Sequence, residues 1–170
     1  MTIEGIWNLC RSLGKRTNLY ETWARKMLVV DARALTFKEG KGVVRDTARA
    51  AQLFIQAAEL GNADAQNEAG NCYQFGKGVP ANDEKAFYYF SLAAKQNQRD
   101  SLDSLGCCYD LGRGTPKNPR RAFEFFQQAA EAKHPYGLYH LGVAYKNGAG
   151  VTKDLPKAQD NLRAAAATEI

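Results

Sequence analysis

The sequence predicts an all-α solenoid of about four helix–turn–helix repeats, each 36 residues long, with an N-terminal cap helix. The main observation is that the segment Ala69–Pro80 returns at Leu105–Pro116 and again at Leu141–Thr152, always 36 residues apart. A fainter copy begins at Phe37. Glycine, alanine and aromatic residues also recur at the same positions of each copy. A fixed period of this length is typical of repeats that stack on one another to bury a shared core.

We expect a single domain over residues 1–170. Residues 1–27 would contain the cap helix and the start of the first repeat helix. The repeats themselves are predicted at 28–63, 64–99, 100–135 and 136–170.

The cap helix is predicted over residues 3–13, where Ile6, Trp7 and other apolar residues share one helical face. It matches neither half of the repeat, so we expect it to cover the exposed core of the first repeat. A helix that binds a membrane surface or a partner is the alternative, because Arg11 and further basic residues lie nearby.

The turn of each repeat is predicted from two glycines one residue apart. Glycine ends a helix easily because it reaches left-handed backbone angles without a Cβ clash. Four residues after the second glycine comes an Asp or Asn, which is the residue type that caps the start of a helix. The capping residues are Asp46, Asn82, Asn118 and Asp154. The second helices are therefore predicted at about 46–60, 82–96, 118–132 and 154–168.

Small and large side chains alternate on the buried face of each predicted helix. In the second helix of the second repeat, Phe90 lies between Ala86 and Ala94 on one face. In the first helix of the third repeat, Gly106 and Tyr109 share a face. We expect the small residues to let neighbouring helices approach and the large ones to fill the remaining space.

The pattern L-G-x-x-Y-x-x-G-x-G-V, followed by Asp or Asn, Ala, an aromatic residue and Ala-Ala, resembles the Sel-one-like repeat (SLR) family, which is related to the tetratricopeptide repeat. The resemblance covers roughly residues 28–167. It implies antiparallel helix pairs stacked into a right-handed superhelix, with an adaptor or scaffold function in place of catalysis. The first copy departs from the pattern, because Arg33 and Ala34 replace Leu-Gly.

The lack of a membrane segment and of a secretory signal favours a cytoplasmic location, and the short, standalone repeat design favours a bacterial protein. The net charge of +5 is too small by itself to indicate nucleic-acid binding. No segment approaches the roughly 18 apolar residues of a membrane helix, and the first residues lack the pattern of a secretory signal.

The cysteines and histidines predict no site for a metal ion, a cofactor or catalysis. Cys72 and Cys108 occupy one column of the repeat, which indicates a small buried residue. Cys107 and Cys108 are adjacent and do not have the usual spacing of metal ligands. His134 is expected in a solvated link and His140 at a helix flank. No cysteine lies in a second helix, so the disulfide that staples the repeats of some secreted SLR proteins is absent.

A partner-binding site is predicted on the concave face, which the first helices of the repeats would line. Helical geometry places the exposed side of each first helix opposite its buried side. The candidate binding residues are Asp64, Asn67, Asn71, Gln74, Asp100, Asp103, Asp110, Tyr136, Tyr139 and Lys146. The aspartates, expected to be exposed, predict a partner with a basic segment, and the tyrosines predict an apolar contact.

The preferred function is therefore a non-catalytic protein–protein interaction module. The alternative within binding is an immunity- or inhibitor-type protein that blocks a bacterial toxin or effector enzyme. A third alternative is an enzyme that binds or hydrolyses β-lactams, as some cysteine-rich SLR proteins are linked to this activity. The missing disulfide pattern and the missing catalytic set disfavour it.

Two further surfaces are candidates for contact with a partner. A basic edge runs along the turns: Lys41, Arg45, Lys77, Arg113, Lys117, Arg120, Arg121, Lys153 and Lys157. Because aromatic residues do not interleave with these cations, a solvated edge is favoured over nucleic-acid binding. The edge of the C-terminal repeat is the other surface, and it is a candidate for homodimer formation.

Overall fold

The computed structural model describes residues 34, 38–39 and 46–168, and this part of the chain holds seven complete α-helices and no strand. The helices are α3 (Thr47–Glu59), α4 (Ala63–Phe75), α5 (Asp83–Ala94), α6 (Arg99–Leu111), α7 (Pro119–Glu131), α8 (Pro135–Asn147) and α9 (Leu155–Ala167). The predicted cap helix and most of the first helix of the first repeat lie outside the described residues.

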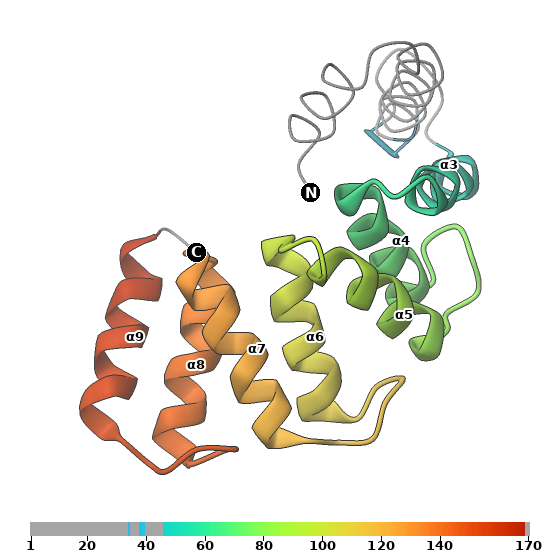
Figure 1. Ribbon diagram of the computed structural model, residues 1–170. Helices are drawn as coiled ribbons and strands as arrows, with labels where there is room; N and C mark the ends of the chain where they lie inside the picture. The colour runs from blue at the N-terminus through green and yellow to red at the C-terminus, as the bar shows by residue number, and fades with distance from the viewer. Residues whose placement is uncertain (1–33, 35–37, 40–45, 169–170) are drawn as a thin grey trace, which may run out of the picture.

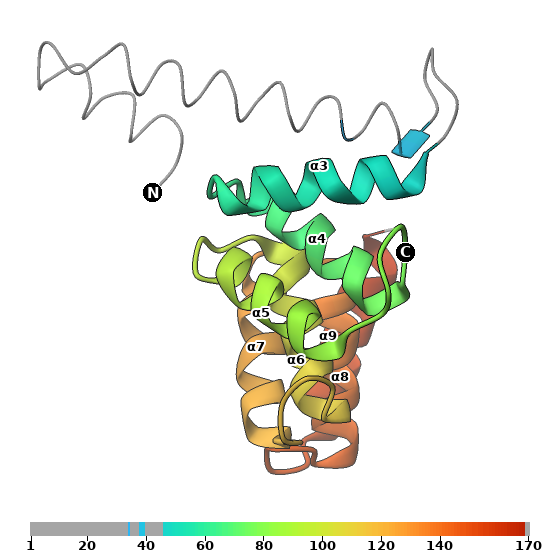
Figure 2. The same ribbon diagram turned by 90° about the vertical axis from the view of Figure 1, so that its right-hand side faces the viewer.

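The described helices form a solenoid of stacked pairs, as predicted. Figure 1 shows the pairs α4/α5, α6/α7 and α8/α9 following one another in chain order. Figure 2 shows that the helix axes turn along the stack, from α3 lying across the view to α8 standing upright. In the same view α5 and α7 lie to the left, and α4 and α8 lie to the right.

The second helices begin where the sequence predicts. Asn82 caps α5 by accepting a hydrogen bond from the backbone N–H of Lys85 at 2.8 Å. Asp46, Asn118 and Asp154 cap α3, α7 and α9 in the same way. Each of these side chains satisfies one of the backbone donors that a helix start leaves without a partner.

The two glycines of each turn have different tasks. The first glycine, for example Gly112 with φ of 72°, closes α6 in the left-handed conformation. The second glycine is a contact between repeats, because a Cβ on Gly114 would lie 2.2 Å from the carbonyl oxygen of Asp83. Gly78 and Gly150 approach Thr47 and Pro119 in the same way. The second glycine therefore sets how closely each turn packs on the previous repeat.

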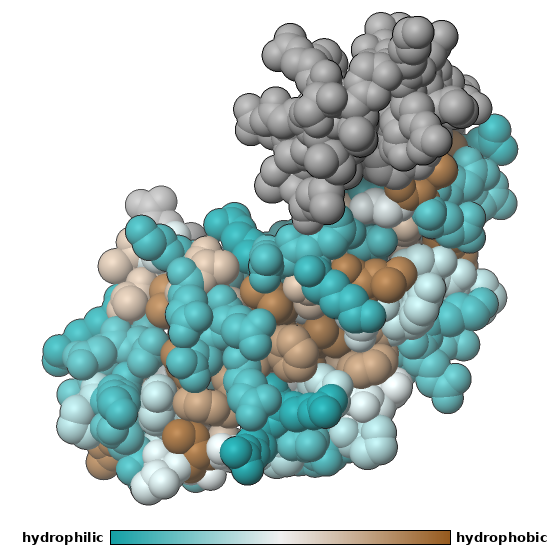
Figure 3. All heavy atoms as spheres, in the orientation of Figure 1, coloured by the Kyte–Doolittle hydropathy of each residue, from teal (hydrophilic) through white to brown (hydrophobic). Residues whose placement is uncertain are grey.

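The core follows the predicted pairing of small with large residues. A Cβ on Gly106 would lie 2.4 Å from the ring of Phe126, which is buried in the next helix. Gly70 and Phe90 make the same contact one repeat earlier. Buried residues continue from one repeat to the next, and Figure 3 shows hydrophobic residues gathered along the middle of the stack with hydrophilic residues around them.

Candidate functional site

Eight of the ten candidate binding residues are exposed or half-buried on one side of α4, α6 and α8. We call this side the inner face. Its exposed members are Asp64, Tyr136, Tyr139 and Lys146, and its half-buried members are Asn71, Gln74, Asp100 and Asp110. Phe75 and Leu111, at the ends of α4 and α6, are also exposed there, by 60% and 58%. The inner face therefore combines acidic side chains with apolar and aromatic ones.

Asn67 is wrongly predicted as a surface residue. Its side chain is buried, and its Oδ1 accepts a hydrogen bond from the Ser101 hydroxyl at 2.8 Å. This contact joins α4 to α6, so Asn67 ties two repeats together. The helical geometry of α4 alone could not reveal this, because the partner belongs to the next repeat.

Asp103 is also buried, contrary to the predicted exposure. Its exposed fraction is 8%, and its Oδ1 lies 2.8 Å from Nδ1 of His140 on α8. The carboxylate is thus enclosed between α6 and α8 with a basic partner. A buried charge needs such a partner, because leaving it unpaired away from water is costly.

Asp100 and His134 form a second link between α6 and α8. His134 was predicted to be a solvated link residue, but it is buried and caps α8, with Nδ1 accepting from the backbone N–H of Gly137. Because Nδ1 accepts, the ring proton is on Nε2 and is donated to Asp100 Oδ1 at 3.1 Å. In the same way, Nε2 of Gln98, the cap of α6, donates a hydrogen bond to Asp64 Oδ1 at 3.5 Å. Part of the predicted acidic surface therefore holds neighbouring repeats together.

A groove opens between α6, α7 and α8 on the inner face. Its volume is about 300 Å³. Its lining comes from α6, α7, α8 and the turn after α8. The lining residues are Cys107, Asp110, Leu111, Pro119, Ala122, Phe123, Phe126, His140, Val143, Ala144, Asn147 and Ala149. Most of them are apolar, and Asp110 adds a negative charge. Among the interactions of the described residues, Asp110 has no basic partner of its own.

The groove meets a cluster of three side chains that sequence spacing did not predict. Cys107 lies one turn after Asp103 on α6, and both face His140 on α8. The Cys107 Sγ and the His140 Nδ1 are 4.0 Å apart. One ligand atom from each of the three residues lies within 4.8 Å of the others. Because His140 is 33 residues beyond Cys107, local ligand motifs could not reveal the cluster.

His140 is positively charged at neutral pH, with a proton on both ring nitrogens. Burial lowers the pKa of its imidazole, but hydrogen bonds to Asp103 and to Cys107 outweigh burial and raise the pKa to about 10. The ring packs against Phe126 and Tyr139, with centroids 4.8 and 5.4 Å away. The imidazole is therefore held in place on its faces as well as at Nδ1.

The other two described cysteines are buried, as their shared column predicts. Cys72, Cys107 and Cys108 are all free thiols. Burial raises the pKa of Cys72, and it raises the pKa of Cys108 to about 11. Cys107 is half-buried and lines the groove, so it differs from both.

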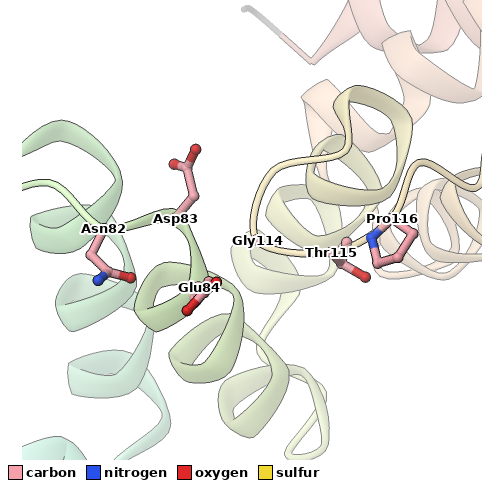
Figure 4. A pocket seen from close by; sticks show the side chains of 6 residues that line it. All are labelled: Asn82, Asp83, Glu84, Gly114, Thr115 and Pro116. Carbon is pink, nitrogen blue, oxygen red and sulfur yellow. The ribbon is translucent and has the colours of Figure 1, made fainter.

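A second hollow, of about 640 Å³, lies between the start of α5 and the turn before α7. Figure 4 shows Asn82, Asp83 and Glu84 on one side and Gly114, Thr115 and Pro116 on the other. It is wide open to solvent and has no apolar floor. We therefore take the groove at α6–α8 as the candidate site.

The basic edge is partly engaged in packing within the repeats. Arg121 and Lys157 of this edge lie over the rings of Tyr109 and Tyr145, at 5.5 and 5.4 Å from the ring centroids. Lys85, which is at the equivalent position of the second repeat but was not part of the predicted edge, lies over Tyr73 at 5.1 Å. Arg121 also donates a hydrogen bond to the Tyr109 hydroxyl at 3.0 Å. Cation–π contacts at exposed sites stabilise by about 0.5–1 kcal/mol each. Lys41 and Arg45 lie outside the described residues.

Among the described residues, no helix has both the length and the apolar character needed to cross a membrane.

Known proteins resemble this chain in both sequence and structure. The crystal structure of a protective antigen of uropathogenic Escherichia coli with an SLR fold superposes with a TM-score of 0.79 at 28% identity, covering 85% of this chain and 31% of the antigen. A Sel1 repeat protein from Oxalobacter formigenes gives a TM-score of 0.78 at 30% identity, covering 85% of this chain and 42% of that protein. Cysteine-rich protein B of Helicobacter pylori gives 0.58 at 27% identity, covering 76% and 93%.

The chain spans less than half the length of the first two of these proteins. A search of curated proteins found no match. The family model for the Sel1 repeat matches residues 34–62, 63–98, 100–134 and 135–167. These four matches cover most of the chain, and the last three coincide with the helix pairs α4/α5, α6/α7 and α8/α9. The chain therefore belongs to the Sel1 repeat family.

Proposed function

We propose that this chain is a non-catalytic interaction module whose inner face binds a segment of a partner protein at the groove between α6 and α8. Proteins built from Sel1 repeats generally mediate protein–protein interaction. The observation that carries the proposal is the groove itself, an apolar hollow with exposed Leu111 beside it. Tyr136 and Tyr139 add exposed aromatic surface on the same face, 52% and 46% exposed.

The size of the groove suits one or two side chains of a peptide. A volume of about 300 Å³ is at the lower end of the range for sites that enclose small molecules. Aromatic and aliphatic anchors that fill such pockets supply most of the affinity at protein interfaces. We therefore expect the partner to insert an apolar side chain over Phe126 and beside Val143.

The charge at the groove favours a basic residue next to that apolar anchor. Asp110 lines the groove and has no basic partner of its own within the described chain. Asp100 and Asp103 already contact histidines, so they contribute less to attraction of a partner than Asp110 does. Such complementarity raises association rates and selects among partners.

Variants of the groove test the proposal by affinity capture from lysate of the source cells, read by quantitative mass spectrometry. Asp110→Lys reverses the charge in the groove, and Val143→Arg fills it. Asp160→Lys makes the same charge reversal, and Gln159→Arg introduces the same arginine, on the exposed part of α9, so the two serve as controls. We expect a partner that wild type and both controls retain and both groove variants lose. Equal retention by all four variants would refute the groove as the binding site.

We also infer a bacterial cytoplasmic setting. The support is that Cys72, Cys107 and Cys108 are free thiols, which are typical of reducing compartments, and that the similar structures come from bacteria. Fractionation of the source cells with an antibody to the chain tests this location. Recovery in a periplasmic or secreted fraction would contradict it.

A further inference from the structure

We propose that Asp103, Cys107 and His140 form a binding site for a divalent transition-metal ion, and that Zn²⁺ is the ion it fits best. A thiolate, an imidazole and a carboxylate are the three ligand types that zinc prefers in proteins. Here one atom of each type meets between α6 and α8 within 4.8 Å of the others. The inference does not depend on the proposed partner-binding function.

The distances between the side chains are close to those of a metal site. Zinc binds sulfur at about 2.3 Å and nitrogen or oxygen at about 2.0–2.2 Å, so tetrahedral ligands lie roughly 3.4–3.6 Å apart. The Nδ1 of His140 is 2.8 Å from Asp103 Oδ1 and 4.0 Å from Cys107 Sγ. These two distances lie on either side of the expected values, so small side-chain rotations would bring the three ligands to a common ion.

Hydrogen bonding engages the Cys107 thiol only weakly. Nδ1 of His140 carries one proton, and Asp103 accepts it at 2.8 Å. The sulfur of Cys107 approaches the same nitrogen at 4.0 Å, which makes a longer and weaker hydrogen bond than the one to Asp103. A metal ion would replace that proton and engage all three side chains.

Comparison with the preceding repeat indicates that the fold does not require these residues. The positions equivalent to Asp103, Cys107 and His140 at the α4–α6 junction are Asn67, Asn71 and Ser104, which are 36 residues earlier. The two junctions occupy equivalent places in the repeat, but only the second has a metal-ligand set. The cluster is thus an addition to the repeat and not one of its structural columns.

The surroundings hold the ligands in position and leave one side open. Asp103 and Cys107 are one turn apart on the same helix, so α6 fixes their relative position. The ring of His140 packs against Phe126 and Tyr139. Cys107 and His140 both line the groove, so a fourth ligand would come from that side, as water or as a side chain of a bound protein. Three protein ligands with one open position are typical of accessible zinc sites.

The test is metal titration of the reduced, tag-free chain. Zn²⁺ affinity is measured by competition with a chromogenic chelator, and Co²⁺ is used to detect the thiolate-to-cobalt charge-transfer band. We expect one ion per chain, with the charge-transfer band present. Cys107→Val places at this position the residue that the next repeat has at Val143, and it leaves the Asp103–His140 pair intact. It should abolish the band and weaken Zn²⁺ binding by at least about tenfold, since even loss of an outer-shell partner costs that much.

Two further variants make the result decisive. Cys108→Ala is the matched control, because Ala144 occupies the same column one repeat later, and it should bind like wild type. Asp103→Asn with His140→Ser places here the neutral residues that occupy the equivalent positions 36 residues earlier, Asn67 and Ser104, and should lose binding while it keeps its helical circular dichroism. Failure of wild type to bind one Zn²⁺ per chain would overturn the proposal. So would equal affinity of wild type and Cys107→Val.

Discussion

The junction between α4 and α6 and the junction between α6 and α8 are at equivalent places in the repeat, but their polar side chains differ in chemistry. At the first, neutral side chains meet, and the Ser101 hydroxyl donates to Asn67. At the second, the charged pair of Asp103 and His140 meets beside a thiol. The second glycine of the turn, Gly114 at the first junction and Gly150 at the second, makes the same close backbone contact at both. Because those shared residues already hold the repeats together, the polar positions between inner helices are free to change with function.

The largest expected loss of stability comes from replacing the second glycine of the turn, which both junctions share. Gly114→Ala and Gly150→Ala should each destabilise by about 3 kcal/mol or more, and by similar amounts. Both glycines have positive φ, and at both an added Cβ would overlap a backbone carbonyl, at 2.2 and 2.1 Å. Urea unfolding measures the effect.

Gly112→Ala is the control within the same turn. It also has positive φ, but an added Cβ would be no closer than 3.4 Å to its neighbours, so only the left-handed conformation costs energy, about 1–2 kcal/mol. If Gly112→Ala were as destabilising as Gly114→Ala, the assignment of the second glycine to contact between repeats would be wrong.

A smaller difference in stability should distinguish the two junctions. Asp103→Ala removes a charged hydrogen bond and is expected to cost about 2–3 kcal/mol, whereas Asn67→Ala removes a neutral one and should cost about 1–2 kcal/mol. The measurement is the free energy of unfolding, with His140→Ser and Asp103→Ala/His140→Ser completing a double-mutant cycle. A coupling energy near zero between Asp103 and His140 would contradict the pairing.

The smallest expected effect is a difference in the labelling rates of the thiols, which does not involve the stability of the fold. The fourth cysteine of the chain, Cys10, is replaced by serine so that only Cys72, Cys107 and Cys108 can react. Cys107 should then react with a thiol reagent faster than the other two, by on the order of tenfold or more, because those two are buried. Peptide mapping after short labelling identifies the modified residue.

Added Zn²⁺ should slow the labelling of Cys107, and a chelator should restore it. Equal labelling of all three cysteines would remove the distinction between the junctions at this position. Labelling of Cys107 that Zn²⁺ does not affect would count against the metal site.

Much of the exposed inner face was predictable because exposure on a helix depends first on its own periodicity. Tyr136, Tyr139, Asp64 and Lys146 are exposed on the inner face as the helical geometry indicates. Asn67 and Asp103 are the failures, since each is buried by a residue of the next repeat. A helix considered alone carries no information on how closely its neighbour approaches.

The helices, the turns and the small-to-large packing follow from local sequence patterns. These depend on local backbone chemistry and on a 36-residue period, as at Asn82, Gly112 and the pair Gly106–Phe126. The polar side chains that meet between repeats are known only from the three-dimensional structure. Asp103, Cys107 and His140 come from two helices, and their distances depend on how one repeat settles on the next. That placement is set by packing across the whole junction, which no local sequence pattern records.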